Sequence, residues 1–202
     1  MEALKVYTNN LFDTNYWDKT WGERIKDPHH VVLNGEKLKH LIKQLWLRPE
    51  YSIKEKLEIG CGSGIHAIRM RQYNPEWTNH WVGIDLSLKA ADWGKNLGLN
   101  IIQGDIYTHT FDKKFDAFLF LDVLEHIQDH DGLAARLIEI GKEHFSILGN
   151  IPLYRSEHSD SCERDIDINV LGRFLKNCGF TGFYHGIYGI NGFPYMFFEA
   201  VR

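Results

Sequence analysis

The chain has 202 residues, a length that suits one domain with a sizeable core. Its formal net charge is −4 and it has no long basic run, which disfavours a nucleic-acid partner held on a broad positive surface. No apolar run approaches the roughly 18 residues of a membrane span, and the N-terminus lacks a basic region followed by an apolar core. Cys61, Cys162 and Cys178 are odd in number and widely spaced, as in a protein with reduced thiols. We therefore expect one soluble cytoplasmic domain over residues 1–202, with no membrane partner.

Residues 1–50 precede the first expected core strand, and we expect them to form a helical cap on a core of residues 51–202. Trp17 and Trp21 share one face if the segment around them is helical. These aromatic side chains suit either core packing or a lid over a ligand cleft. A second, amphipathic helix is predicted before Pro49 from apolar residues at helical spacing, which are Leu38, Leu41, Ile42, Leu45 and Trp46.

From residue 51 onward, strand patterns alternate with helix patterns. Strands are predicted at 57–59, 81–85, 99–103, 115–121 and 145–148, and helices at 65–73, 88–97 and 132–142. One more helix over 168–178 ends at Gly179. Two aromatic-rich strands follow at 180–188 and 195–201, and their short connection suits a hairpin. Strands separated by helices require crossovers and a parallel sheet. The pattern predicts an α/β fold: a Rossmann-like, doubly wound, seven-stranded, mainly parallel sheet with an antiparallel C-terminal hairpin strand.

The most informative stretch is the glycine loop, Gly60-Cys61-Gly62-Ser63-Gly64, which lies between the first strand and a helix. Glycines at such a turn permit positive φ and let a ligand approach the main chain closely. A dinucleotide fingerprint requires glycine or alanine where Ile65 stands, so the spacing disfavours an NAD site. With the acid Glu58 two residues before its first glycine, the loop resembles motif I of the class I S-adenosylmethionine-dependent methyltransferases.

That cofactor offers a ribose diol, an adenine, an amino-acid tail and a sulfonium, but no phosphate. Asp85, at the end of the second strand, can accept both ribose hydroxyls through its two oxygens. The resemblance implies an adenine contact at Asp105 and Ile106, although Asp105 also suits an Asx-turn. It further implies that the main chain around Leu121 holds the methionine amino group, with Glu58 near the same tail. The predicted cofactor-binding residues are Glu58, Gly60, Cys61, Gly62, Asp85, Leu86, Asp105, Ile106 and Leu121.

The sequence from Asp122 to Ile127 resembles the segment after the fourth strand of small-molecule methyltransferases, including those of ubiquinone biosynthesis. The resemblance places His126 at the cleft, near the nucleophile of the acceptor. Alternatively, Glu125 and His126 cap the following helix. His158 lies in a polar segment after the fifth strand and is a second candidate for acceptor binding or deprotonation, with an ordinary surface loop as the alternative. The predicted catalytic residues are His126 and His158.

A metal site is the alternative role for this segment. The set Asp122, Glu125, His126 and His158 is similar to the E-x-x-E-H…H ligands of RNA 3′-end 2′-O-methyltransferases. The first ligand here is the shorter Asp, which withdraws its oxygens by about 1.5 Å, and metal–ligand distances tolerate only about 0.2 Å. We therefore predict that no metal is required.

The sequence thus predicts a methyltransferase that uses S-adenosylmethionine to methylate a hydroxyl or amine of a small-molecule acceptor. The principal alternative is a partner or regulatory protein that binds S-adenosylmethionine or S-adenosylhomocysteine without turnover. An NAD-dependent oxidoreductase fits the glycine spacing less well. An amino-group DNA methyltransferase is disfavoured because Asp122-Val123-Leu124-Glu125 replaces its N-P-P-Y or D-P-P-Y tetrapeptide. The sequence names neither the acceptor nor the oligomeric state.

Overall fold

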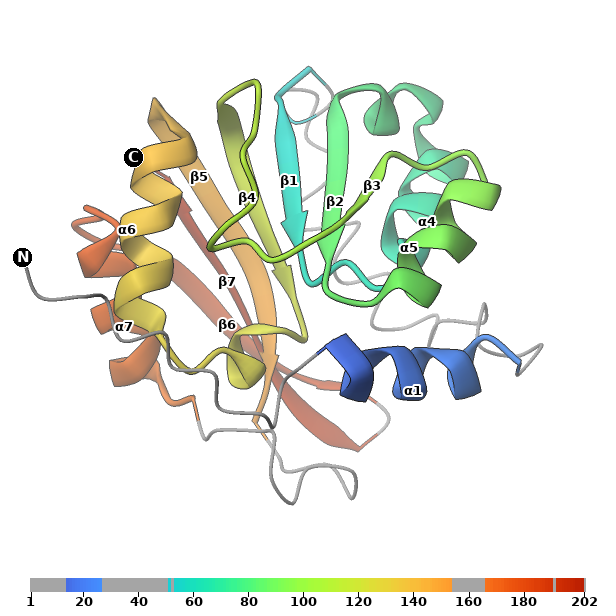
Figure 1. The fold of residues 1–202 in the computed structure, drawn as a ribbon. Coiled ribbons are helices and arrows are strands. Elements are labelled where there is room, and N and C mark those ends of the chain that lie inside the picture. The colour runs from blue at the N-terminus through green and yellow to red at the C-terminus, as the bar shows by residue number, and fades with distance from the viewer. Residues whose placement is uncertain (1–13, 27–50, 52, 154–165, 191, 202) are drawn as a thin grey trace, which may run out of the picture.

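The computed structural model describes residues 14–26, 51, 53–153, 166–190 and 192–201. The predicted α/β fold is confirmed: the strands form one seven-stranded sheet in the order β3-β2-β1-β4-β5-β7-β6 (Figure 1). The strands are β1 (Lys56–Ile59), β2 (Trp81–Asp85), β3 (Ile101–Gln103), β4 (Phe115–Leu121), β5 (Gly141–Pro152), β6 (Tyr184–Ile190) and β7 (Phe193–Val201). The α-helices (α) and 3₁₀-helices (η) are α1 (Thr14–Arg24), α4 (Ile65–Tyr73), η3 (Pro75–His80), α5 (Leu88–Asn96), η4 (Leu124–His126), α6 (His130–Ile140) and α7 (Ile168–Asn177).

The first five strands are parallel, and β7 runs antiparallel to both of its neighbours, β5 and β6. The carboxyl ends of β1, β2, β3 and β4 therefore meet along one edge of the sheet. Helix α1 lies beside this edge (Figure 1). Ligands of open α/β sheets bind at the carboxyl ends of the strands, so the topology already selects the region to search for a site.

Two apolar cores cover the two faces of the sheet. Along β4, Phe118 and Phe120 pack on the side of α6 and α7, whereas Leu119 and Leu121 pack on the opposite side with α4 and α5. Burial on both faces explains why β4 is an almost continuous apolar run instead of an alternating pattern.

Several element bounds differ from the sequence predictions. Helix α6 ends at Ile140 and not at residue 142, because Gly141 is extended and pairs with Phe115 in the sheet. The strand predicted at 145–148 is consequently the middle of a longer β5. The strand predicted from residue 180 begins only at Tyr184, because the N–H of Phe180 still donates to the Leu175 carbonyl in the cap of α7. The turn of η3 was not predicted.

Several predictions lie outside the described residues: the amphipathic helix around Leu38–Trp46, the segment with His158, and Cys162. The division into a cap of 1–50 and a core of 51–202 stays a prediction. Cys61 and Cys178 are both buried. Among the residues that the structure describes, no helix combines the length and the apolar character needed to cross a bilayer.

Candidate cofactor-binding site

The glycine loop joins β1 to α4 in a conformation that requires glycine. Gly60, Gly62 and Gly64 have φ values of 63°, 55° and 73°, in the left-handed region that side chains disfavour. A Cβ added to Gly60 would lie 2.3 Å from Cγ2 of Val123, and one added to Gly62 would lie 2.1 Å from Cζ2 of Trp21. The loop therefore presents bare main chain to the two segments that pass over it, after β4 and in α1.

Asp85 ends β2 beside this loop. Its Oδ2 accepts the Gly62 N–H at 2.7 Å and its Oδ1 accepts the Ser87 N–H at 2.9 Å. The side chain is only 8% exposed, and this burial raises the pKa of Asp85 to about 6, with smaller contributions from Glu58 and Asp18. Each carboxylate oxygen has two lone pairs, so each can accept one more hydrogen bond at neutral pH. The two remaining positions suit a vicinal diol.

Glu58 lies beneath the loop. It is 1% exposed; its Oε2 accepts the indole N–H of Trp81 at 2.9 Å, and its Oε1 lies 3.4 Å from Nδ1 of His66. These contacts attach β1 to β2 and to the first turn of α4. The structure thus gives Glu58 a supporting position, and a direct contact with the cofactor tail stays a prediction.

The loop after β3 lies next to Asp85, because the Gly104 N–H donates to the Asp85 carbonyl at 2.9 Å. Oδ1 of Asp105 accepts the N–H of Tyr107 at 2.9 Å, so the Asx-turn alternative occurs. The turn uses one oxygen of a two-oxygen carboxylate. It therefore leaves an adenine contact chemically compatible with Asp105, and Ile106 is buried beside it.

The chain leaves β4 in a strained conformation. Asp122 has a φ of 53° and is the one non-glycine residue with positive φ in the described part of the chain. Its Oδ1 accepts a hydrogen bond from Nδ2 of the fully buried Asn150 at the neighbouring end of β5. Strained residues held by buried partners are common at functional sites. Because Asp122 is left-handed, the helical turn starts only at Leu124, and Asp122 does not share a helical face with Glu125.

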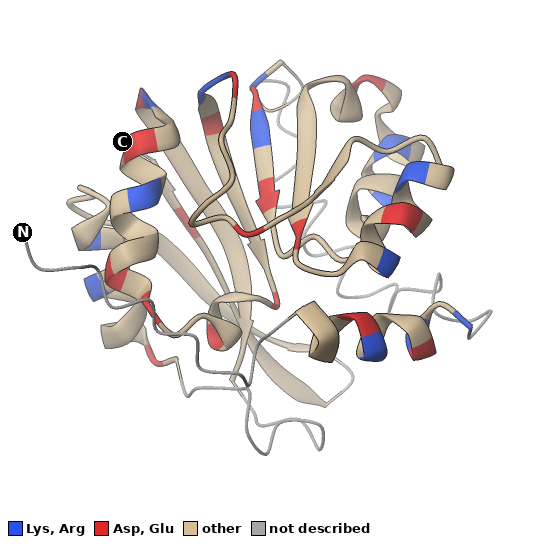
Figure 2. Ribbon diagram, viewed as in Figure 1, with Lys and Arg blue, Asp and Glu red and all other residues tan. Residues whose placement is uncertain are grey.

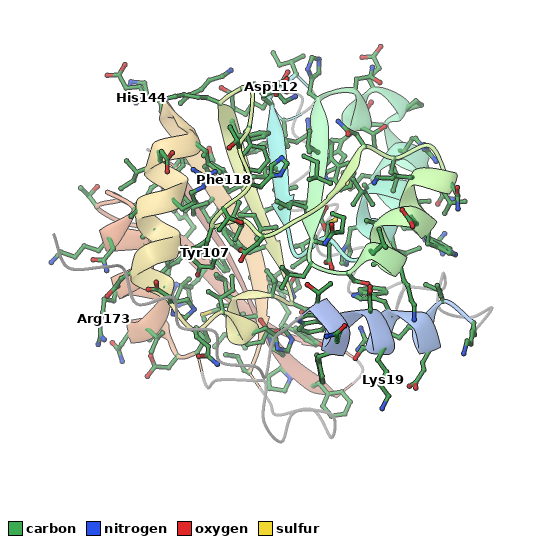
Figure 3. All side chains as sticks on the ribbon, viewed as in Figure 1. Lys19, Tyr107, Asp112, Phe118, His144 and Arg173 are labelled. Carbon is green, nitrogen blue, oxygen red and sulfur yellow. The ribbon has the colours of Figure 1, made fainter. Side chains whose placement is uncertain are left out.

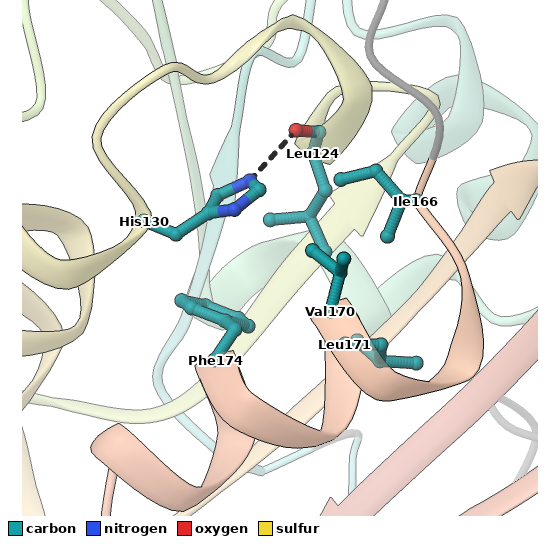
Figure 4. A pocket seen from close by; sticks show the side chains of 6 residues that line it. All are labelled: Leu124, His130, Ile166, Val170, Leu171 and Phe174. Atoms are coloured by element: carbon teal, nitrogen blue, oxygen red, sulfur yellow. Dashed lines mark hydrogen bonds between the residues drawn. The ribbon is translucent and has the colours of Figure 1, made fainter.

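His126 occupies the last position of η4. Its ring lies 5.2 Å from the ring of Trp17, centroid to centroid, and its Nε2 lies 4.0 Å from Oε1 of the buried Glu125. A small apolar hollow beside η4 leaves no room for a water molecule, and its wall includes His130, which bonds the Leu124 carbonyl at 3.0 Å (Figure 4). This hollow lies between η4 and α7 and forms part of their packing.

The structure gives no direct test of the metal prediction. Within the described residues, no three His, Cys, Asp or Glu side chains converge on a common point. His158, the fourth candidate ligand, lies outside them, so the prediction that no metal is required stays a prediction.

Helix α1 closes the site from outside. Oδ1 of Asp18 accepts the hydroxyl of Ser87 at 2.6 Å and the N–H of Lys89 at 3.1 Å, which joins α1 to the start of α5. Burial opposes ionisation, but these bonds hold the pKa of Asp18 below its usual value. Neither Asp18 nor Ser87 was predicted from the sequence as part of the site. The one available signal was Ser87 as a helix N-cap, which it is, accepting the Ala90 N–H at 3.2 Å.

Acidic residues thus gather at the sheet edge that faces α1, where Figure 2 shows red segments near the ends of the central strands. A parallel sheet with a glycine loop after β1 and an acid after β2 defines a Rossmann-like nucleoside-binding domain. Residues 57–143 match the family model described as a methyltransferase domain. This segment therefore carries a methyltransferase domain, in agreement with the family that the sequence predicts.

Three solved structures illustrate the same fold. Magnesium protoporphyrin IX methyltransferase from Synechocystis, with bound S-adenosylhomocysteine, has a TM-score of 0.72 at 14% identity over 94% of this chain and 97% of that one. Phosphoethanolamine N-methyltransferase 2 of Haemonchus contortus, in complex with S-adenosylmethionine, also has a TM-score of 0.72 at 14% identity, over 94% of this chain and 59% of that one. A possible histamine N-methyltransferase from Thermotoga maritima has a TM-score of 0.68 at 14% identity over 93% and 99%. No protein of curated function matches the chain.

The class takes its methyl group from S-adenosylmethionine, which agrees with the cofactor predicted from the sequence. The residues present suit this molecule at two points. Asp85 keeps two acceptor positions for the ribose hydroxyls, and the left-handed turn at Gly60 and Gly62 leaves main chain without a Cβ, against which Val123 and Trp21 pack.

Proposed function

We propose that this protein transfers the methyl group of S-adenosylmethionine to a hydroxyl or amine of a small-molecule acceptor in the cytoplasm. The observation that carries the proposal is Asp85, a buried carboxylate that bonds the glycine loop through one oxygen and retains acceptor positions on both. A phosphate-binding site would be built with cationic or N–H donors instead.

The strand order supports one orientation of the cofactor. With the ribose on Asp85 at the end of β2, the amino-acid tail lies over the glycine loop after β1 and near the main chain of Leu121 at the end of β4. The base then lies on the other side of Asp85, over Asp105 and Ile106 after β3. Leu86 follows Asp85 directly and borders the same ribose position.

The methyl group is bound to a positively charged sulfur and is already activated, so the protein need only position the acceptor and take up its proton. His126 lies in η4, which follows β4, the strand paired with β1 and its glycine loop, and a histidine there can serve as the general base. The buried Glu125 carboxylate, 4.0 Å away, stabilises the imidazolium that results. The ring of Trp17 packs edge-on against His126, at 5.2 Å between ring centroids, and is proposed to limit the access of water to this side chain.

The acceptor is proposed to be small, without a nucleic-acid partner. The structural neighbours that support this differ in their acceptors, as their names state: one acts on magnesium protoporphyrin IX and another on phosphoethanolamine. Their names point to no single acceptor chemistry, so the proposal keeps both a hydroxyl and an amine. His158 is proposed as a second group on the acceptor side.

A product-formation assay tests the proposal. Purified protein, S-adenosylmethionine and a panel of small amines, phenols and hydroxy acids are incubated, and S-adenosylhomocysteine is quantified. At least one acceptor should give turnover, and His126→Gln should lower kcat/KM about 100-fold or more, the usual worth of a general base. His126→Gln should leave the affinity for S-adenosylhomocysteine within about twofold, since His126 is not proposed to bind it. Normal binding of S-adenosylhomocysteine without turnover of any acceptor would favour the non-catalytic alternative.

A further inference from the structure

The loop after β3 is held in place by a residue far away in the chain, Arg136 of α6. Its Nε donates to the Ile106 carbonyl at 3.0 Å, and its Nη2 donates to the His109 carbonyl. The Arg136 side chain is 11% exposed, and its Nη1 pairs with the exposed Glu139 at 2.7 Å. One largely buried guanidinium thus bonds both ends of the segment 106–109.

Hydrogen bonds within the loop after β3 further restrict its conformation. The N–H groups of Thr108 and His109 donate to the Asp105 carbonyl at 3.1 and 2.8 Å, and the N–H of Tyr107 donates to Oδ1 of Asp105 at 2.9 Å. These bonds make a single compact turn in which the Asp105 carboxylate has a defined direction.

A second bond joins the same turn to the start of α6. The hydroxyl of Tyr107 donates to the Asp129 carbonyl at 2.8 Å, and Asp129 caps α6 by accepting the Gly132 N–H at 2.8 Å. Tyr107 lies on the α6 side of the sheet (Figure 3), and the chain between β3 and β4 crosses the sheet toward α6 (Figure 1). The turn is therefore braced against α6 at two points, Asp129 and Arg136.

A fixed position of the Asp105 carboxylate affects which base the site can recognise. Adenine presents a 6-amino donor, which a carboxylate can accept, whereas hypoxanthine presents a carbonyl at the same position and repels it. Discrimination requires that the carboxylate cannot turn away from the wrong base, because a mobile group would instead bond water. A braced Asp105 meets that requirement.

We propose that Arg136 is a positioning residue that sets the selectivity of the site for adenine over hypoxanthine by holding the Asp105–His109 turn. The inference rests on the proposed function, since it takes the base of the bound nucleoside to lie on Asp105. Arg136 acts through the turn and touches no base itself.

The test compares two ligands that differ only at this position of the base. Calorimetric titration with S-adenosylhomocysteine and with S-inosylhomocysteine should give the wild type a preference of about tenfold or more for the adenine compound, the scale of one charged hydrogen bond. Arg136→Met should reduce that preference to within about threefold, with most of the loss in the adenine compound. Arg136→Lys keeps the positive charge but cannot donate to both carbonyls at once. Its preference for the adenine compound should therefore lie between those of the wild type and Arg136→Met.

Two control variants separate positioning from general destabilisation. Glu139→Gln removes the ion pair and keeps both carbonyl bonds, so the preference should remain at the wild-type value. Arg71→Met removes a comparable bond, from Nη2 of Arg71 to the Leu97 carbonyl at 3.2 Å, away from the turn, and should also keep it.

Equal losses of affinity for both ligands in Arg136→Met would reduce Arg136 to a structural role and overturn the inference. An unchanged preference in a folded Arg136→Met, or a wild type without preference, would overturn it as well. If Arg136→Met does not fold, the preference of Arg136→Lys decides in the same way. Failure of the wild type to bind S-adenosylhomocysteine would contradict the proposed function itself, and with it this inference.

Discussion

Asp85 is ionised at neutral pH in a place that disfavours its charge. Burial raises its pKa from the ordinary value of 3.8 to about 6, even though two N–H groups donate to it. In the unfolded chain the same carboxyl ionises near its ordinary pKa, so between these values the folded state binds more protons. Its contribution to stability is therefore fully present below pH 4 and is lost as the pH rises through 6. The difference between the two pKa values corresponds to about 3 kcal/mol.

The free-energy cost of ionising Asp85 in the folded protein predicts how the stability of Asp85→Asn depends on pH. Asparagine has nearly the same shape as aspartate and carries no charge. The free energy of unfolding of the variant relative to wild type should increase by up to about 3 kcal/mol between pH 4 and pH 7. Urea denaturation of both proteins at several pH values measures this difference. A constant difference across that range would mean that Asp85 titrates normally in the folded protein.

The same carboxylate makes ligand binding pH-dependent. Ribose hydroxyls donate to the ionised form, and protonation below about pH 6 removes acceptor positions. A group that destabilises the fold at neutral pH is thus retained at the position where the proposed ligand needs it. Such a trade between stability and activity is common at binding sites.

At the scale of elements, α1 and the glycine loop form the most direct contact across the site. The ring of Trp21 lies against Gly62, at the position where the loop offers bare main chain. Asp18 anchors the same helix to the start of α5 through Ser87 and Lys89. Because α1 is placed by these few contacts, cofactor entry and exit are expected to depend on its displacement.

Trp21→Ala removes the ring that covers Gly62 and should raise both the association and dissociation rates of S-adenosylhomocysteine severalfold. Stopped-flow fluorescence or surface plasmon resonance measures the two rates. Tyr16→Ala is the matched control, because Tyr16 lies on the same helix but packs on Trp17, at 5.1 Å between ring centroids. Rates that stay at wild-type values in Trp21→Ala would show that α1 does not gate the site.

For the molecule as a whole, the features that could be predicted from the sequence are those that depend on patterns of neighbouring residues. The periods of the strands and helices and the glycine loop predicted the sheet. They also predicted the edge where Asp85 ends β2 and where Asp105 and Asp122 follow β3 and β4. These patterns are reliable predictors because each depends only on residues that are close together in the sequence.

The features that the sequence did not reveal depend on distant pairs. Three such contacts join segments that are far apart in the chain. They are the packing of Trp21 against Gly62, the hydrogen bond from Asn150 to Asp122, and the bonds from Arg136 to the turn after β3. No periodicity encodes such pairs, since they follow from how the elements pack. Local propensity was also overridden at Gly141, where pairing in the sheet extended β5 and shortened α6.

Equilibrium binding of S-adenosylhomocysteine to the wild type and to Asp85→Ala, measured by titration calorimetry with NAD as the comparison ligand, tests the central claim most directly. The account predicts one-to-one binding of S-adenosylhomocysteine to the wild type and no measurable binding of NAD. Asp85→Ala should weaken the binding by roughly 1–3 kcal/mol, the scale of lost charged hydrogen bonds. Binding of NAD without binding of S-adenosylhomocysteine, or full affinity in Asp85→Ala, would contradict it.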